Sequence, residues 1–259
     1  MLADSHVHLY DSAFDADRAQ VLQRARDAGV AQLVIPAAGA ASWPRIRGLC
    51  AAHPRLLFPA YGLHPLYLRQ HAPGDVDSLS SWCDAHAAVA IGEIGLDFHT
   101  GDLNPALQRN YFTRQLALAR ELGLPVIVHA RQALEEVILT LRRHPGLHGV
   151  VHSFSGSVEQ AHRLWQLGFL IGIGGPVTYE RAQRLRRIVA GMPIEHLLLE
   201  SDAPDQPDAA HRGQRNEPAR IAEVLRCVAA LRGEAESAVA AATVANTRRL
   251  FRLPSPESG

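Results

Sequence analysis

Short apolar runs recur along the chain, and between them lie longer segments whose apolar residues return at helical spacing. The runs are rich in Val, Ile and Leu and are too short for helices, as is typical of buried parallel strands. They predict eight strands, at residues 1–9, 31–37, 56–62, 88–94, 124–130, 149–154, 169–173 and 196–202.

The intervening segments repeat apolar residues at i, i+3 and i+4, which predicts a helix after each strand. These helices are expected at residues 17–28, 42–52, 75–86, 105–122, 132–143, 157–166, 179–190 and 217–231. A further helix at about 234–251 would close the underside or side of the barrel that these elements form. Eight strand–helix units in one chain of 259 residues predict an α/β fold, a (β/α)8 TIM barrel with an extra C-terminal helix.

Composition fits one large domain. Hydrophobic residues make up 47% of the chain, enough for a sizeable core, and no stretch approaches the roughly 20 apolar residues of a membrane span. We therefore expect a soluble barrel over residues 1–252. The tail at 253–259 is rich in Pro, Ser and Gly and is expected to be mobile.

Cysteine use and the N-terminus bear on the compartment. No hydrophobic leader precedes the first strand, and Cys50, Cys83 and Cys227 are odd in number and far apart. This pattern favours a reducing, cytoplasmic location and buried thiols, and it argues against a thiolate zinc site.

The net charge and the absence of lysine exclude several kinds of binding and catalysis. The formal net charge is zero, so a nucleic-acid substrate has to be bound locally. All 26 basic residues are Arg. The absence of Lys excludes Schiff-base chemistry, Walker-type phosphate loops and a carbamylated-lysine metal bridge.

Six residues able to bind a metal stand at or near the ends of separate apolar runs. They are His6, His8, Glu93, His129, His152 and Asp202. The carboxyl ends of parallel barrel strands meet at one rim, where such side chains converge. His6 and His8 are two residues apart on a predicted strand and so leave the same face. Taken alone, this pair is a weak signal among 14 histidines, and two hydrogen-bonded histidines at the surface or in the core would also explain it.

The carboxylates strengthen the metal interpretation. Glu93 and Asp202 each follow apolar residues, where an unpaired buried negative charge would be costly and a cation would remove that cost. Nitrogen and oxygen donors without sulfur suit Zn²⁺, Mn²⁺, Fe²⁺ or Mg²⁺. Six candidates exceed the needs of one tetrahedral ion, so we expect two divalent ions bridged by Glu93 and a hydroxide. Arg131 can fork onto a phosphate oxygen, and His64 ends the third strand at the same rim.

In several ordered segments the chain resembles the TatD-type metal-dependent deoxyribonucleases, a branch of the amidohydrolase-like barrels. The segments are DSHVHL, YGLHP, IGEIGLDFH, LPVIVHAR, VHSFSG, LLLESDAP and RGQRNEP. The resemblance extends from residue 4 to about 251. It implies that the six candidates above are the metal ligands, that Arg131 is the arginine on the phosphate side and that His64 is the histidine of the GxHP motif.

The chain departs from the family pattern at a few positions. Ala130 replaces a residue that often carries a hydroxyl, Ser153 stands where cysteine is common, and the segment 205–211 has fewer Tyr and Leu residues. These departures bear on substrate preference more than on activity.

The resemblance implies cleavage of phosphodiester bonds in DNA by a metal-activated hydroxide. In this hypothesis Glu93 bridges the ions, Asp202 holds a metal and accepts the proton of the nucleophile, and Arg131 stabilises charge on the phosphate. No membrane and no obligate protein partner are expected. Two alternatives stay open: an amidohydrolase or lactonase that acts on a small molecule with the same two metals, and a barrel that binds metal or a partner without catalysis.

Overall fold

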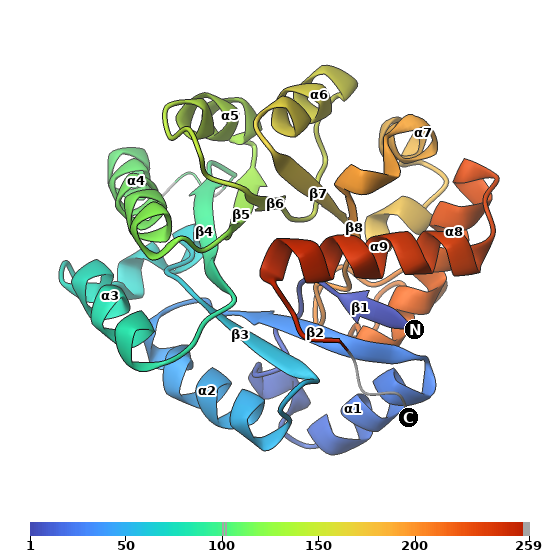
Figure 1. The fold of residues 1–259 in the computed structure, drawn as a ribbon, viewed down its shortest axis with the longest axis horizontal. Coiled ribbons are helices and arrows are strands. Elements are labelled where there is room, and N and C mark those ends of the chain that lie inside the picture. Colours follow the sequence, from blue (N-terminus) through green and yellow to red (C-terminus); the bar gives the residue numbers. More distant parts are fainter. Residues whose placement is uncertain (100, 102, 256–259) are drawn as a thin grey trace.

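The computed structural model describes residues 1–99, 101 and 103–255. In this part of the chain eight parallel strands form one sheet in the order β1 to β8, nearly closed into a barrel with helices around it (Figure 1). The predicted (β/α)8 barrel is confirmed. The strands are β1 (Leu2–Asp4), β2 (Val30–Pro36), β3 (Leu57–Tyr61), β4 (Ala90–Asp97), β5 (Val126–Arg131), β6 (Gly149–Val151), β7 (Phe169–Ile173) and β8 (Leu197–Leu199).

The helices follow the predicted alternation with small shifts at their ends. They are α1 (Arg18–Asp27), α2 (Trp43–Ala52), α3 (Asp75–Ala85), α4 (Pro105–Leu122), α5 (Leu134–Arg142), α6 (Val158–Gln166), α7 (Gln183–Gly191), α8 (Ile221–Arg232) and α9 (Glu236–Phe251). Short 3-10 helices are η1 (Ser12–Phe14), η2 (Ala40–Ser42), η3 (Pro65–Gln70), η4 (Gly175–Thr178), η5 (Ile194–His196), η6 (Ala209–His211) and η7 (Pro218–Arg220). The predicted start of α8 was too early because the 3-10 helix η7 precedes it, and the predicted start of α7 was too early because residues 179–182 form a non-helical turn.

Several predicted strand ends were wrong. β1 ends at Asp4, so His6 and His8 lie beyond the strand. The strands predicted at 149–154 and 196–202 are shorter and end at Val151 and Leu199. Shortly afterwards the backbone enters the left-handed region at Ser153 (φ 46°) and Asp202 (φ 57°), so neither strand can extend through its predicted end. β4, in contrast, continues to Asp97, so Glu93 lies within the strand and not at its end.

The loop segments that follow β1 and β8 are joined by backbone hydrogen bonds. Ser5 N donates to Leu199 O at 3.0 Å, Asp202 N to His6 O at 2.9 Å, and His8 N to Ala203 O at 2.8 Å. This seam links the first and last strands of the barrel. It also places His6 and Asp202 side by side, although 196 positions separate them in the chain.

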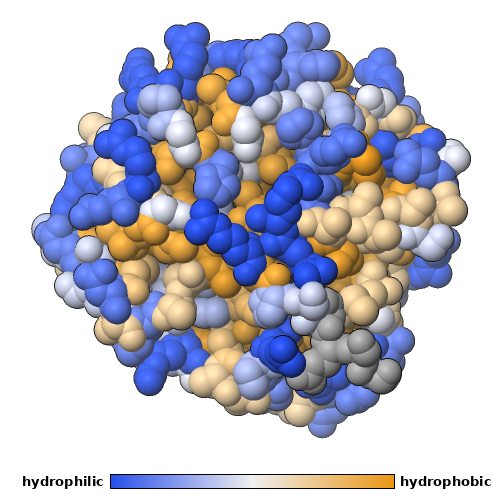
Figure 2. Space-filling view, viewed as in Figure 1, coloured by the Kyte–Doolittle hydropathy of each residue, from blue (hydrophilic) through white to orange (hydrophobic). Residues whose placement is uncertain are grey.

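The two ends of the barrel differ in what covers them. α9 crosses in front of the ring of strands in Figure 1, and the same side in Figure 2 is covered mainly by hydrophilic residues with hydrophobic areas between them. Leu250 and Phe251 of α9, together with Leu253, pack into a core cluster with Phe58 and Val150. The expected closing helix therefore covers the end of the barrel opposite the rim at which the predicted metal ligands lie.

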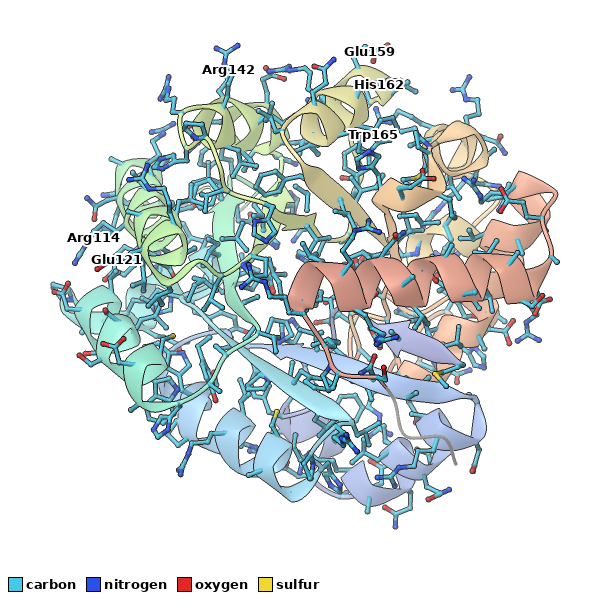
Figure 3. The ribbon with its side chains drawn as sticks, viewed as in Figure 1. Arg114, Glu121, Arg142, Glu159, His162 and Trp165 are labelled. Atoms are coloured by element: carbon cyan, nitrogen blue, oxygen red, sulfur yellow. The ribbon has the colours of Figure 1, made fainter. Side chains whose placement is uncertain are left out.

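The outer helices bury one face against the strands. On α6, Glu159 points outward while Trp165 lies toward the ring (Figure 3). None of the helices in the described part of the chain has the length and apolar character required to cross a bilayer. Of the cysteines expected to be buried, Cys50 is buried and Cys83 and Cys227 are half-buried, and all three are free.

Candidate metal centre

The other five predicted ligands gather around the carboxylate of Glu93. Its Oε2 lies 3.2 Å from His6 Nε2 and 3.5 Å from His8 Nε2. Its Oε1 lies 3.0 Å from His129 Nδ1 and 2.7 Å from His152 Nε2. The two oxygens of one carboxylate thus face two separate groups of imidazoles, as a bridging carboxylate would.

Asp202 faces the first of these groups. Its Oδ1 lies 3.5 Å from His6 Nε2 and 3.6 Å from His8 Nε2. Its Oδ2 accepts a hydrogen bond from the side chain of Gln206, which fixes the orientation of the carboxylate. The positive φ of Asp202 is uncommon for a non-glycine residue, although Asp tolerates it better than most, and it directs this side chain toward the barrel mouth.

In two of the imidazoles, the nitrogen that points away from Glu93 makes a hydrogen bond, which determines that the other nitrogen carries no proton. His8 Nδ1 lies 3.2 Å from Pro36 O, and His129 Nε2 lies 2.9 Å from Asp97 Oδ2. A carbonyl or an ionised carboxylate accepts, so those nitrogens carry the proton and His8 Nε2 and His129 Nδ1 keep their lone pairs. Both free nitrogens face Glu93 and are available to a cation.

His64 differs from these two histidines because its protonated nitrogen faces Glu93. Its Nδ1 accepts from Leu66 N at 3.0 Å, so the proton is on Nε2, which lies 2.8 Å from Glu93 Oε1. Burial lowers the pKa of His64 to about 4, which keeps the ring neutral. His64 therefore donates to Glu93 and has no free nitrogen for a metal.

Unsatisfied polar atoms in the centre fit a cation. Glu93 Oε2 is buried and has no hydrogen-bond donor in the described part of the chain, despite the nearby imidazoles. Imidazole nitrogens also face each other, His6 Nε2 with His8 Nε2 at 3.2 Å and His129 Nδ1 with His152 Nε2 at 3.3 Å. Imidazole nitrogens and a carboxylate oxygen brought this close are stabilised by positive charge between them.

Electrostatics hold Glu93 in its charged form. Burial alone would raise its pKa, but the surrounding His152, His64 and His6 hold it well below the usual range. Burial raises the pKa of Asp202. One carboxylate is thus set up to remain an anion, and the other to take up a proton more readily.

Arg131 lies at the rim, as predicted, and lines the same cavity as His129 and Glu93. Its side chain is exposed and has no ion pair in the part of the chain that the structure describes. A free guanidinium at this position is available to a phosphate oxygen.

The sequence interpretation missed three buried carboxylates beside the centre. Asp97 orients His129. Asp4 Oδ2 accepts from Ser201 Oγ at 2.6 Å across the seam, and burial raises the pKa of Asp4 to about 7. Glu200 Oε1 accepts from Ser153 N at 2.6 Å, and burial raises the pKa of Glu200 to about 8. Each stands at the end of an apolar run, the same signal that identified Glu93.

Comparison with known proteins gives the family. The model of TatD related DNase matches residues 3–252. The uncharacterized metal-dependent hydrolase YjjV of Escherichia coli K12 is 40% identical over 254 residues, covering 97% of this chain and 98% of that protein. The 3'-5' ssDNA/RNA exonuclease TatD of Erwinia billingiae is 36% identical over 258 residues, covering 97% and 99%. The crystal structure of the E. coli YjjV protein matches with a TM-score of 0.93 at 39% identity and 98% coverage of both chains. The chain therefore belongs to the TatD related DNase family of metal-dependent hydrolases.

Proposed function

We propose that this protein is a nuclease that hydrolyses phosphodiester bonds in single-stranded DNA or RNA with two divalent cations. The observation that carries the proposal is the division of donors around Glu93, whose two oxygens face two groups of imidazoles. The substrate class is supported by the Erwinia relative, which is named as an exonuclease.

The donors divide between the two cations. By their distances from Glu93 and Asp202, His6, His8 and Asp202 would hold one cation, His129 and His152 the other, and Glu93 both. This nitrogen and oxygen set is compatible with Mg²⁺, Mn²⁺, Zn²⁺ or Fe²⁺. When bound, the cations supply Lewis-acid polarisation of the phosphate and lower the pKa of water.

Side chains of the protein carry out the remaining steps of the proposed reaction. Asp202, whose pKa is raised by burial, accepts the proton that the attacking water loses. Arg131 binds a non-bridging phosphate oxygen and stabilises the charge that grows there. His64 donates to Glu93 and keeps that carboxylate oriented.

Nucleic acid is the partner that we infer, and a cytoplasmic location stays a prediction. The free state of Cys50, Cys83 and Cys227 supports a reducing compartment.

Cleavage of labelled single-stranded DNA by metal-stripped protein, with each cation added back in turn, tests the proposal. We expect metal-dependent cleavage by wild type and a loss of about a hundredfold or more in Glu93→Gln and Asp202→Asn. Elemental analysis should find about two ions per chain in wild type.

The matched control is Asp77→Asn, because Asp77 is an exposed acid that pairs with Arg114 far from the centre. It should cleave like wild type. Equal cleavage by all variants would refute the mechanism. Hydrolysis of lactones or esters without cleavage of DNA or RNA would instead support the small-molecule hydrolase. Metal-dependent stabilisation without turnover of any substrate would support a structural role.

A further inference from the structure

The mouth of the barrel is a cavity of about 830 Å³ whose two halves differ in charge. On one side it is lined by Arg131, which ends β5, and by Arg181 and Arg184, which follow β7. On the other side lie Asp11, Tyr67 and Asp205, from the segments after β1, β3 and β8. Because the strands run in order around the barrel, the segments after β5 and β7 face those after β1 and β3, and the segment after β8 lies between the two halves, next to the segment after β7.

The arginines on the first side are free to bind anions. Arg181 and Arg184 are exposed, and neither has an ion pair within the described residues. Arg184 Nη2 donates to Ser155 O at 2.8 Å, and the Arg181 guanidinium lies 5.4 Å from the centre of the Tyr179 ring. Each guanidinium is positioned by one contact and keeps further N–H donors available. This arrangement suits phosphate oxygens.

Outside this cavity, arginines on the surface often form ion pairs with carboxylates. Arg163 Nη1 lies 2.8 Å from Glu135 Oε1, and Arg114 Nη2 lies 2.7 Å from Asp77 Oδ1. In a chain with zero net charge, unpaired arginines in the cavity are the local binding surface that a polyanion requires.

The opposite side of the cavity is aromatic and acidic. The Tyr67 side chain is 41% exposed, and its ring lies edge to face with His64 at 5.8 Å. His64 in turn contacts Glu93, so a group attached to a phosphate at the metal centre reaches Tyr67. Asp11 and Asp205 line the same cavity as Tyr67. Burial raises the pKa of Tyr67, and these two carboxylates raise it further. A base or sugar can pack on this ring, whereas a phosphate is repelled.

We propose that the phosphates of a single strand run over Arg181 and Arg184, while the terminal nucleoside packs on Tyr67 beside Asp205 and Asp11. This inference rests on the nuclease function above. The acidic residues beside Tyr67 would make the enzyme selective for a strand end that carries a hydroxyl group and not a phosphate.

The selectivity determines which bond must break. After each cut the shortened strand has to end in a hydroxyl to be accepted again. The water oxygen therefore forms a bond to phosphorus, and the bond from phosphorus to the oxygen of the remaining strand breaks. That oxygen leaves with the electron pair and takes a proton, and the released mononucleotide keeps the phosphate.

A length series tests the arginine side. A dinucleotide, with one internal phosphate, and a decanucleotide are cleaved by wild type, by the double variant Arg181→Gln/Arg184→Gln and by Arg187→Gln. Arg187 is exposed on the same helix α7 but does not line the cavity, so it is the matched control. We expect the double variant to raise KM for the decanucleotide about tenfold or more and to leave the dinucleotide unchanged. The slope of log affinity against log salt should fall by roughly 1.4.

A second series tests the acidic side, with decanucleotides that carry a phosphate at neither end, at the 3' end or at the 5' end. Wild type should cleave one phosphorylated form about tenfold more slowly than the hydroxyl form. Asp205→Asn should reduce that difference. Tyr67→Ala should raise KM for all three substrates, and Tyr67→Phe should not.

Anisotropy of a labelled decanucleotide gives a binding readout that needs no turnover. Binding without cleavage by wild type would refute the proposed function, and the variants would then be judged on their affinities. Cleavage with the same KM in the double variant and in Arg187→Gln, or equal rates on all three ends, would overturn this inference alone. Neither binding nor cleavage by wild type would overturn both.

Discussion

The contact between Asp97 and His129 shows how one buried side chain prepares another. Asp97 Oδ2 holds the protonated Nε2 of His129 at 2.9 Å and so turns Nδ1 toward Glu93. We expect Asp97→Ala to lower metal affinity about ten- to hundredfold, because the ring loses its orientation. Asp97→Asn keeps an acceptor oxygen and should lose less. Calorimetric metal titration measures both, and wild-type affinity in Asp97→Ala would contradict the assigned role.

At the scale of single residues, the positions of the candidate ligands were predictable from the sequence, whereas the contacts made by the carboxylates that support them were not. The ligands share a signal, a polar residue next to an apolar run, that sequence alone displays. Asp4 gains its partner Ser201 from the far end of the chain, 197 positions away, so its role depends on the closed barrel. The left-handed backbone of Asp202 has no signature in the sequence.

Strands β4 and β5 approach each other so closely that one position admits only glycine. Gly95 has a φ of +140°, and a Cβ there would lie 2.1 Å from His129 O. We expect Gly95→Ala to lower the free energy of unfolding by about 2–5 kcal/mol, because strain adds to the clash. Urea denaturation measures the change.

The control for Gly95 is Gly48→Ala, at an exposed position in α2 with no atom within 4 Å of the added Cβ. It should stabilise the protein by roughly 0.5–1 kcal/mol, because alanine favours the helix. Gly95→Ala as stable as wild type would refute the close approach of the strands.

The number and order of the elements were predictable from apolar periodicity, since each βα unit repeats the same pattern. The ends of the elements were not. β1 and β8 each have only three residues in the sheet, and the apolar runs continue beyond them because the following segments are buried in the seam. Burial determines where apolar residues occur, whereas hydrogen bonding between strands determines where a strand ends. The two differ where a strand continues into a buried loop of the candidate metal centre.

At the scale of the whole molecule, an ion-pair network on the surface links the segment after β8 to the start of α1. Arg215 forks onto Asp17 with two contacts of 2.7 Å. The hydrogen bond from Arg215 lowers the pKa of Asp17 to about 2, from an ordinary value of 3.8. A lowered pKa in the folded state means that the stabilisation is complete above about pH 4 and disappears as the pH falls toward 2.

The stability difference between wild type and Arg215→Gln should therefore be largest near neutral pH and shrink between about pH 4 and pH 2. Urea denaturation over a pH series measures it. The control is Arg212→Gln, because Arg212 is exposed and has no ion pair among the residues described. A difference that stays constant with pH would exclude the Arg215–Asp17 pair as its source.

The apolar cluster around Phe251 and the candidate metal centre occupy opposite ends of this barrel, so they should respond to different substitutions. Phe251 is 2% exposed in the cluster that closes one end, whereas the candidate metal centre opens at the other. Phe251→Ala should cost about 3–5 kcal/mol of unfolding free energy through the cavity it leaves. Exposed Ser237 lies on the same helix, and Ser237→Ala should change little. Below the unfolding transition, metal affinity should be the same in Phe251→Ala as in wild type. Loss of affinity in the folded variant would show instead that α9 holds the strands in the register that the ligands require.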